Sequence, residues 1–251
     1  MRHLFKAFFI LSLCVLFACG KAKETNDDSS GNVVNQNETI KPDGSNINGI
    51  YATDLMPLNK NIHMRKVGVA AVKREGDSFS AYVKIKTGQK STTLRQAIYT
   101  GRRCPNIKDD LNKDAYIDMR EALVAIGKIV IPLDSNLDSQ QAGLNRYPSG
   151  DAVTGTYSYE ITASFERMFA DLKDQDENTS DNIIKLAADD GLTFPGRIVF
   201  LQGLNEKVFL PPTIAAISGE SVHKTMPVAC GVLWKVNKMP DELMGKDLRL
   251  H

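Results

Sequence analysis

Short apolar runs separated by turn-forming residues dominate the sequence between residues 50 and 236. Residues 79–86, FSAYVKIK, alternate apolar with polar side chains, which is the period-2 pattern of a half-buried strand. Glycine with acidic residues marks the turns, as in Glu75-Gly76-Asp77. The pattern predicts a mainly β fold, a single β-sandwich domain with a few short helices in its loops. The expected strands are residues 50–58, 67–73, 79–86, 93–99, 128–133, 156–161, 197–201 and 228–236.

Two short segments have helical rather than strand-like spacing. Residues 164–172, SFERMFADL, begin with a serine suited to an N-cap and place Phe165, Met168, Phe169 and Leu172 at helical intervals. This segment is expected to pack as a helix on the sheet. Residues 119–126 are the second helical candidate.

The N-terminus predicts export. Arg2 and Lys6 precede an apolar run at residues 7–17, which is too short for the roughly 20 residues that span a bilayer. A basic start with a short apolar run is typical of a secretory signal, here residues 1–18. The run ends in Leu16-Phe17-Ala18-Cys19, which resembles the lipobox of bacterial lipoprotein precursors. Cys19 is then the lipid-bearing first residue of the mature chain. An ordinary secretory signal with an incidental cysteine, or an uncleaved anchor, also fits.

Residues 19–49 are expected to be a lipid-anchored, disordered tether, since they are rich in Asn, Asp, Ser, Lys and Gly and cannot bury enough surface to order themselves. A flexible chain of this length reaches roughly 30 Å. The globular domain follows at 50–236, and the tail, 237–251, is expected as a short helix or a frayed end. The N-terminal lipid makes a membrane of the bacterial cell envelope the expected partner. Gly20 after the lipidated cysteine favours the outer membrane under enterobacterial sorting rules.

The charge balance argues against a nucleic-acid partner. The chain holds 31 Lys and Arg against 30 Asp and Glu, and signal cleavage would remove two basic residues and no acidic one. A mature chain this close to neutral has no basic excess for a polyanion.

The four cysteines have different expected fates. Cys14 leaves with the signal and Cys19 carries the lipid, so Cys104 and Cys230 remain as a pair in an oxidising compartment. A disulfide between them is expected, with two free buried thiols as the alternative. A metal site on the pair is not expected, because neither cysteine has a nearby histidine or second cysteine.

Residues 110–121, DLNKDAYIDMRE, match the calcium loop of the EF-hand position by position. Calcium is a hard cation that takes six to eight oxygen ligands. Asp118 would act directly or through water, and Glu121 with both of its oxygens. The alternative is an acidic surface loop that matches by chance. The expected ligands are the side chains of Asp110, Asn112, Asp114, Asp118 and Glu121 and the backbone carbonyl of Tyr116.

Two departures from the template weaken the expected site. Position 6 usually holds glycine because the turn needs a positive φ, and here it is Ala115, at a cost of roughly 1–2 kcal/mol. The usual entering helix is also missing, because Arg103-Cys104-Pro105 is typical of a loop. An isolated, exposed site of this kind is expected to bind calcium at about 10⁻⁴–10⁻³ M, as a structural clip rather than a sensor.

Several segments resemble a set of uncharacterised bacterial secreted proteins and lipoproteins. They are residues 101–105 (GRRCP), the calcium loop, 128–134 (KIVIPLD), 194–200 (FPGRIVF), 210–213 and 226–231. These proteins are similar to CHRD-type (chordin) β-domains, which share a superoxide-dismutase-like sandwich, and the resemblance covers about 94–233. Where the relatives carry H-x-H-x-G, residues 96–101 read QAIYTG. A copper or zinc site and dismutase chemistry are therefore not expected.

No nucleophile elbow, phosphate loop, dinucleotide fingerprint or zinc motif appears in the sequence, so no catalytic residue is assigned. The leading hypothesis is a lipid-anchored, calcium-binding envelope protein with a noncatalytic binding or scaffolding role and an unidentified protein or polysaccharide partner. The alternative is an envelope or extracellular enzyme with a structural calcium ion.

Overall fold

The computed structural model describes residues 47–59, 67–86, 92–138, 147, 155–174, 184–187, 191–217 and 219–245. The chain divides into two compact units, Met1–Val33 and Val34–His251, and all the described residues belong to the second. The signal sequence, Cys19 and nearly all of the tether lie outside the described residues. Within the described ranges no helix has the length and apolar character needed to cross a membrane.

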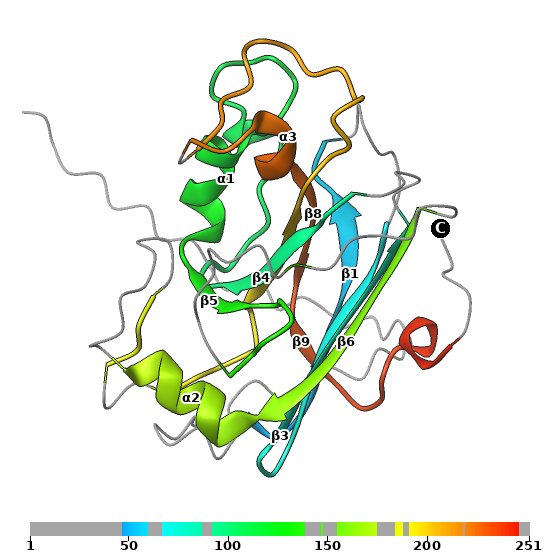
Figure 1. Ribbon diagram of the computed structural model, residues 1–251, viewed down its shortest axis with the longest axis vertical. Helices are drawn as coiled ribbons and strands as arrows, with labels where there is room; N and C mark the ends of the chain where they lie inside the picture. The colour runs from blue at the N-terminus through cyan, green and yellow to red at the C-terminus, as the bar shows by residue number, and fades with distance from the viewer. Residues whose placement is uncertain are drawn as a thin grey trace, which may run out of the picture. The chain divides into compact units, whose positions relative to one another are not determined.

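The predicted mainly β domain is confirmed. Antiparallel strands form one curled, 9-stranded sheet in the order β5-β4-β7-β8-β1-β2-β3-β6, with β9 paired to β1 (Figure 1). Each predicted strand is present, and the last one divides at Leu233 into two. The strands are β1 (Gly49–Pro57), β2 (Gly68–Glu75), β3 (Ser78–Lys86), β4 (Arg95–Tyr99), β5 (Ile129–Pro132), β6 (Thr156–Ser164), β7 (Ile198–Gln202), β8 (Pro227–Val232) and β9 (Trp234–Val236).

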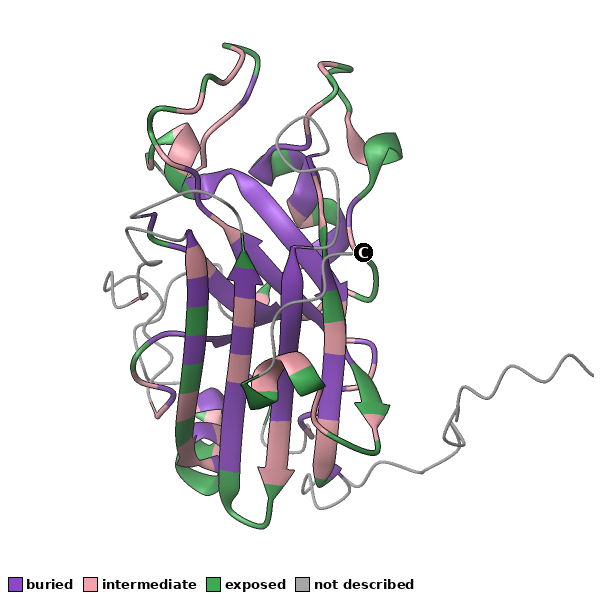
Figure 2. Cartoon of the chain, turned by 90° about the vertical axis from the view of Figure 1, so that its right-hand side faces the viewer, coloured by how far each residue is buried: buried purple, intermediate pink, exposed green. Residues whose placement is uncertain are grey.

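The two halves of the sheet are buried differently, and their sequences show why. Strands β3 and β6 alternate buried with more exposed residues, as expected when one face meets the core and the other meets solvent (Figure 2). Strands β7 and β8 are buried along almost their whole length. Their second face is covered by helix α1 (Met119–Ile126), which packs Met119, Ala122 and Ile126 into a small apolar cluster with Phe200. The candidate loop 110–121 leads directly into this covering helix.

The two predicted helices are present. Helix α1 has the expected bounds, and α2 (Phe165–Lys173) starts after Ser164, whose hydroxyl accepts from the Arg167 amide as the N-cap. The tail forms a short 3-10 turn, η3 (Asp241–Met244), which lies against β2 and β3 (Figure 2). Lys84 holds it by donating to the carbonyl of Glu242 at 3.1 Å. Two further turns are η2 (Ile107–Asp109) and α3 (Val222–Thr225).

Candidate functional site

Loop 110–121 connects η2 to the first turn of α1 in the upper part of Figure 1. In the described part of the chain, only two residues other than glycine have a positive φ, Lys113 at 60° and Ala115 at 68°, and both are in this loop. Ala115 therefore adopts the left-handed conformation that position 6 of the calcium template requires. Because such a residue costs roughly 1–2 kcal/mol, other contacts must hold the loop in this shape.

Side chains in the first half of the loop accept hydrogen bonds from its own amides. Asp110 accepts from Asp114 at 3.2 Å through Oδ1 and from Ala115 at 2.9 Å through Oδ2. Asn112 accepts from the Asp114 amide at 3.0 Å, and Asp114 accepts from the Tyr116 amide at 2.9 Å. These bonds wrap the backbone around three of the predicted ligands and offset the strain at Ala115.

The second half of the loop is closed by Asp118 and Glu121, whose side chains are buried. Asp118 is the N-cap of α1 and accepts from the Glu121 amide, while Glu121 accepts in return from the Asp118 amide at 3.0 Å. The other Glu121 oxygen accepts from Leu111 at 2.7 Å and Asn112 at 3.3 Å. Glu121 therefore joins the end of the loop to its beginning, which is where position 12 of a calcium loop acts.

The loop is pinned to the body of the protein by Asn59, which sequence reasoning missed. Its buried side chain accepts from the Ile117 amide at 2.7 Å and donates to the Ile117 carbonyl at 3.1 Å and the Pro227 carbonyl at 2.9 Å. The side chain of Ile117 is 1% exposed in the cluster beneath α1. No pattern in the sequence links Asn59 to a loop 58 residues away.

A second loop, residues 203–221, contacts loop 110–121 directly (Figure 1). The Thr213 hydroxyl donates to Asp114 Oδ2 at 2.5 Å, and Asn112 Nδ2 lies 3.4 Å from the Thr213 carbonyl. The Ala215 amide donates to Asp118 Oδ2 at 2.9 Å. Two predicted calcium ligands, Asp114 and Asp118, therefore also bind loop 203–221.

These contacts change the acidity of Asp114. Partial burial opposes its ionisation, but hydrogen bonds from Thr213, Tyr116 and Asn112 outweigh this, and the pKa of Asp114 lies below its ordinary value. Asp114 is therefore an anion at neutral pH, which is the form in which a carboxyl group binds calcium.

The donor set of loop 110–121 fits calcium by its chemistry. Every expected side-chain ligand offers an oxygen, and a carboxylate has about four lone-pair sites, so an oxygen that accepts an N–H group can also face a cation. In the residues described, no group of three or more His, Cys, Asp or Glu side chains lies close enough together to hold a metal ion. Backbone amides bring the ligands onto one turn, and calcium binding stays a prediction.

The predicted disulfide between Cys104 and Cys230 is confirmed. The two cysteines are 126 positions apart in the sequence, and their Cα atoms are 5.8 Å apart. Cys230 is buried in β8, beneath α1. The bond therefore fixes the chain just upstream of loop 110–121 to the sheet. His223 has Nε2 2.8 Å from the Val208 carbonyl, and His63 lies outside the described residues.

No family model and no curated protein matches the chain. Among solved structures, a mutant of a SOD-like protein from Bacillus subtilis is 13% identical with a TM-score of 0.35, covering 72% of this chain and 95% of that one. Cu/Zn superoxide dismutase from Brucella abortus is 14% identical with a TM-score of 0.36, covering 73% and 98%. At identities and TM-scores this low, these similarities carry no argument about the fold or the chemistry of this chain.

Proposed function

We propose that this chain is a lipid-anchored, calcium-binding protein of the bacterial cell envelope, in which calcium holds loop 110–121 against loop 203–221 to shape a noncatalytic binding surface. The observation that carries the proposal is the shared use of Asp114 and Asp118. Each is a candidate calcium ligand, and each also accepts a hydrogen bond from loop 203–221. A cation on these carboxylates would therefore stabilise both loops.

Apolar side chains exposed on the two loops support a binding role. Phe209 is 85% exposed and Leu111 is 72% exposed, and Ile107 just upstream is also exposed. Exposed apolar side chains on neighbouring loops are what a binding surface would offer to a partner. The partner of this surface would be a protein or a polysaccharide.

The first described strand begins far from these loops. Gly49, at the start of β1, pairs with Arg74 beside the β2–β3 hairpin, whereas Asn59, just beyond the end of β1, contacts loop 110–121. A strand of this length spans roughly 30 Å. The chain therefore enters β1 at the hairpin end, about one strand length from the two loops.

Calcium titration of the full chain tests the metal-binding step. At one hundred times its dissociation constant, calcium should raise the free energy of unfolding by about 2.7 kcal/mol, which corresponds to a melting temperature higher by roughly 5–10 °C in a domain of this size. Glu121→Gln should abolish this shift, because it removes the carboxylate that closes the loop.

Asp109→Asn is the matched control. Asp109 lies directly before the loop and forms its ion pair with Arg103, so the variant should keep the calcium response. A wild-type protein whose melting temperature ignores millimolar calcium would disprove the metal-binding step. An Asp109→Asn variant that loses the response as Glu121→Gln does would show that only local acidity matters.

A further inference from the structure

Two sequence segments that the calcium proposal leaves unused meet in the structure. They are GRRCP, residues 101–105, and FPGRIVF, residues 194–200. Arg102 reaches across to the second segment and donates to the Pro195 carbonyl through Nη1 at 2.8 Å. Gly196 makes this possible, because a Cβ at its position would lie 2.9 Å from that nitrogen, and its φ is +77°.

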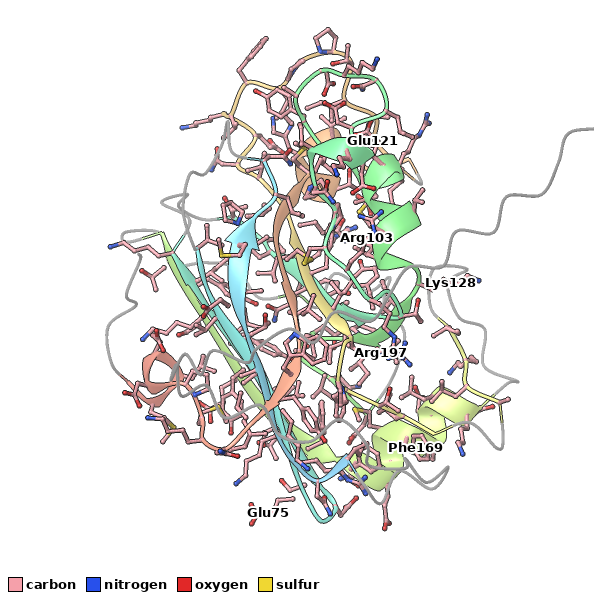
Figure 3. All side chains as sticks on the ribbon, turned by 180° about the vertical axis from the view of Figure 1, so that it is seen from behind. Glu75, Arg103, Glu121, Lys128, Phe169 and Arg197 are labelled. Atoms are coloured by element: carbon pink, nitrogen blue, oxygen red, sulfur yellow. A yellow bond between two sulfur atoms is a disulfide. The ribbon has the colours of Figure 1, made fainter. Side chains whose placement is uncertain are left out.

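The next residue, Arg197, reaches back toward the first segment. Its Nη1 donates to the Thr100 carbonyl at 2.9 Å and its Nε to the Thr193 carbonyl at 3.2 Å. The two guanidinium groups are therefore held at one corner of the sheet. Figure 3 shows Arg197 below Arg103. Lys128 borders this corner. The Thr100 amide donates to the Lys128 carbonyl at 2.8 Å, and the Lys128 amide donates to the Thr100 hydroxyl at 3.0 Å.

Among the described residues, no acidic side chain pairs with the positive charge of this corner. Elsewhere Arg103 binds Asp109 with two bonds of 2.7 Å, and Arg95 binds Glu220 at 2.9 Å. Within the part of the chain that the structure describes, Arg102 and Arg197 contact only backbone carbonyls. Burial, and then the charge of Arg102, lower the pKa of Arg197, although an arginine stays charged at any physiological pH. Holding two cations together costs free energy that a bound anion would offset.

The two side chains also keep donors for such an anion. An arginine has five N–H groups in a planar fork. Arg102 uses one nitrogen and Arg197 two, and within the described residues their Nη2 groups donate to no protein acceptor. Forked N–H groups match the oxygens of a phosphate or carboxylate.

We propose that Arg102 and Arg197 form an oxyanion-binding site for a phosphate monoester group, with Lys128 as a third cation at its edge. Two guanidinium groups match the double charge of a phosphate monoester better than the single charge of a carboxylate. The site is separate from loop 110–121, so a test of phosphate binding does not depend on whether the loop binds calcium.

Titration of the full chain with inorganic phosphate, in EDTA and at constant ionic strength, tests the site by calorimetry. Arg102→Gln should weaken phosphate binding by about tenfold or more, because a charge-assisted hydrogen bond contributes about 1.5–3 kcal/mol. Lys128→Gln should weaken it by about two- to fivefold, and its side chain makes no described structural contact, so this variant is expected to fold.

Arg103→Gln is the matched control, because it removes the same side chain one residue away, where Asp109 already binds it. It should change phosphate affinity by less than about twofold.

Vesicles of phosphatidylcholine with phosphatidic acid, compared with phosphatidylcholine alone, distinguish a lipid headgroup from a small phosphate. Arg102-dependent binding of either probe supports the site. The proposal is overturned if neither probe binds more tightly than acetate, or if Arg103→Gln weakens binding as much as Arg102→Gln.

Discussion

The two ends of the sheet build their turns from different residues. At the hairpin end, β2 turns into β3 through Gly76-Asp77, where glycine supplies the positive φ of 60°. The Asp77 carboxylate then caps α2 by accepting from the Glu166 amide at 2.7 Å and the Ser164 hydroxyl at 2.8 Å. One glycine and one aspartate complete this end with ordinary turn chemistry.

At the loop end, Lys113 and Ala115 take the same left-handed conformation without the freedom of glycine. Four carboxylates and one amide side chain are needed to hold the turn. A backbone that departs from local preference and is stabilised by costly polar groups is typical of a functional site. The strain at the loop end, which the hairpin end lacks, supports our proposal that the binding surface lies there.

The largest expected effect comes from removing the bond that ties the loop end to the sheet. The double change Cys104→Ser and Cys230→Ser should lower the free energy of unfolding by about 4–5 kcal/mol, because it frees a closed loop of more than a hundred residues in the unfolded chain. Urea denaturation measures this loss. Hydrogen exchange should show faster opening in loop 110–121, with the β2–β3 hairpin still protected. Equal loss of protection at both ends would contradict the local role of the disulfide.

A pair of opposite substitutions tests the difference in backbone strain. Gly76→Ala should destabilise the protein by about 1–2 kcal/mol, since a left-handed alanine is strained even though a Cβ there would meet nothing within 4 Å. Ala115→Gly should stabilise it by about 0.5–1 kcal/mol, because relief of strain exceeds the added entropy of the unfolded chain. Urea denaturation gives both values. If both changes destabilise the protein, the strain assigned to Ala115 is absent.

Local patterns in the sequence predicted most of the fold. The alternation of apolar and polar residues predicted β3. The helical spacing of apolar residues after Ser164 predicted α2, with Ser164 as its N-cap. The split of the last strand at Leu233 was missed, because Leu233 is as apolar as its neighbours. Apolar patterns also could not reveal that the sheet is continuous through β1, which pairs with both β2 and β8.

Only the part of the candidate site that lies within loop 110–121 could be predicted from the sequence. The template correctly placed the left-handed turn at Ala115. It did not predict that Asp118 and Glu121 cap α1 reciprocally. The partners Asn59 and Thr213 come from distant segments and bind through one side chain each, which leaves no periodic or spacing signal. The hydrogen bond from Arg102 to the Pro195 carbonyl could not be predicted either, although the family resemblance includes both of their segments.

The smallest expected effect concerns the contact between the two loops. Because the pKa of Asp114 is lowered in the folded protein, its ionised form stabilises the fold above its unfolded pKa, near 3.9, and this contribution is lost as pH falls through the folded pKa. Thr213→Val removes a hydrogen bond to the carboxylate, so the pKa of Asp114 should rise toward its unfolded value. The acid-induced loss should then be smaller and be complete at a higher pH. The carboxyl chemical shift of Asp114, followed by NMR as pH is lowered, measures the change.

Asp77 is the internal control, because its pKa is lowered by hydrogen bonds from Glu166 and Ser164 at the hairpin end and should not change in the variant. A shift in both aspartates would mean that the variant disturbs the whole sheet, and a shift in neither would mean that Thr213 does not couple the two loops.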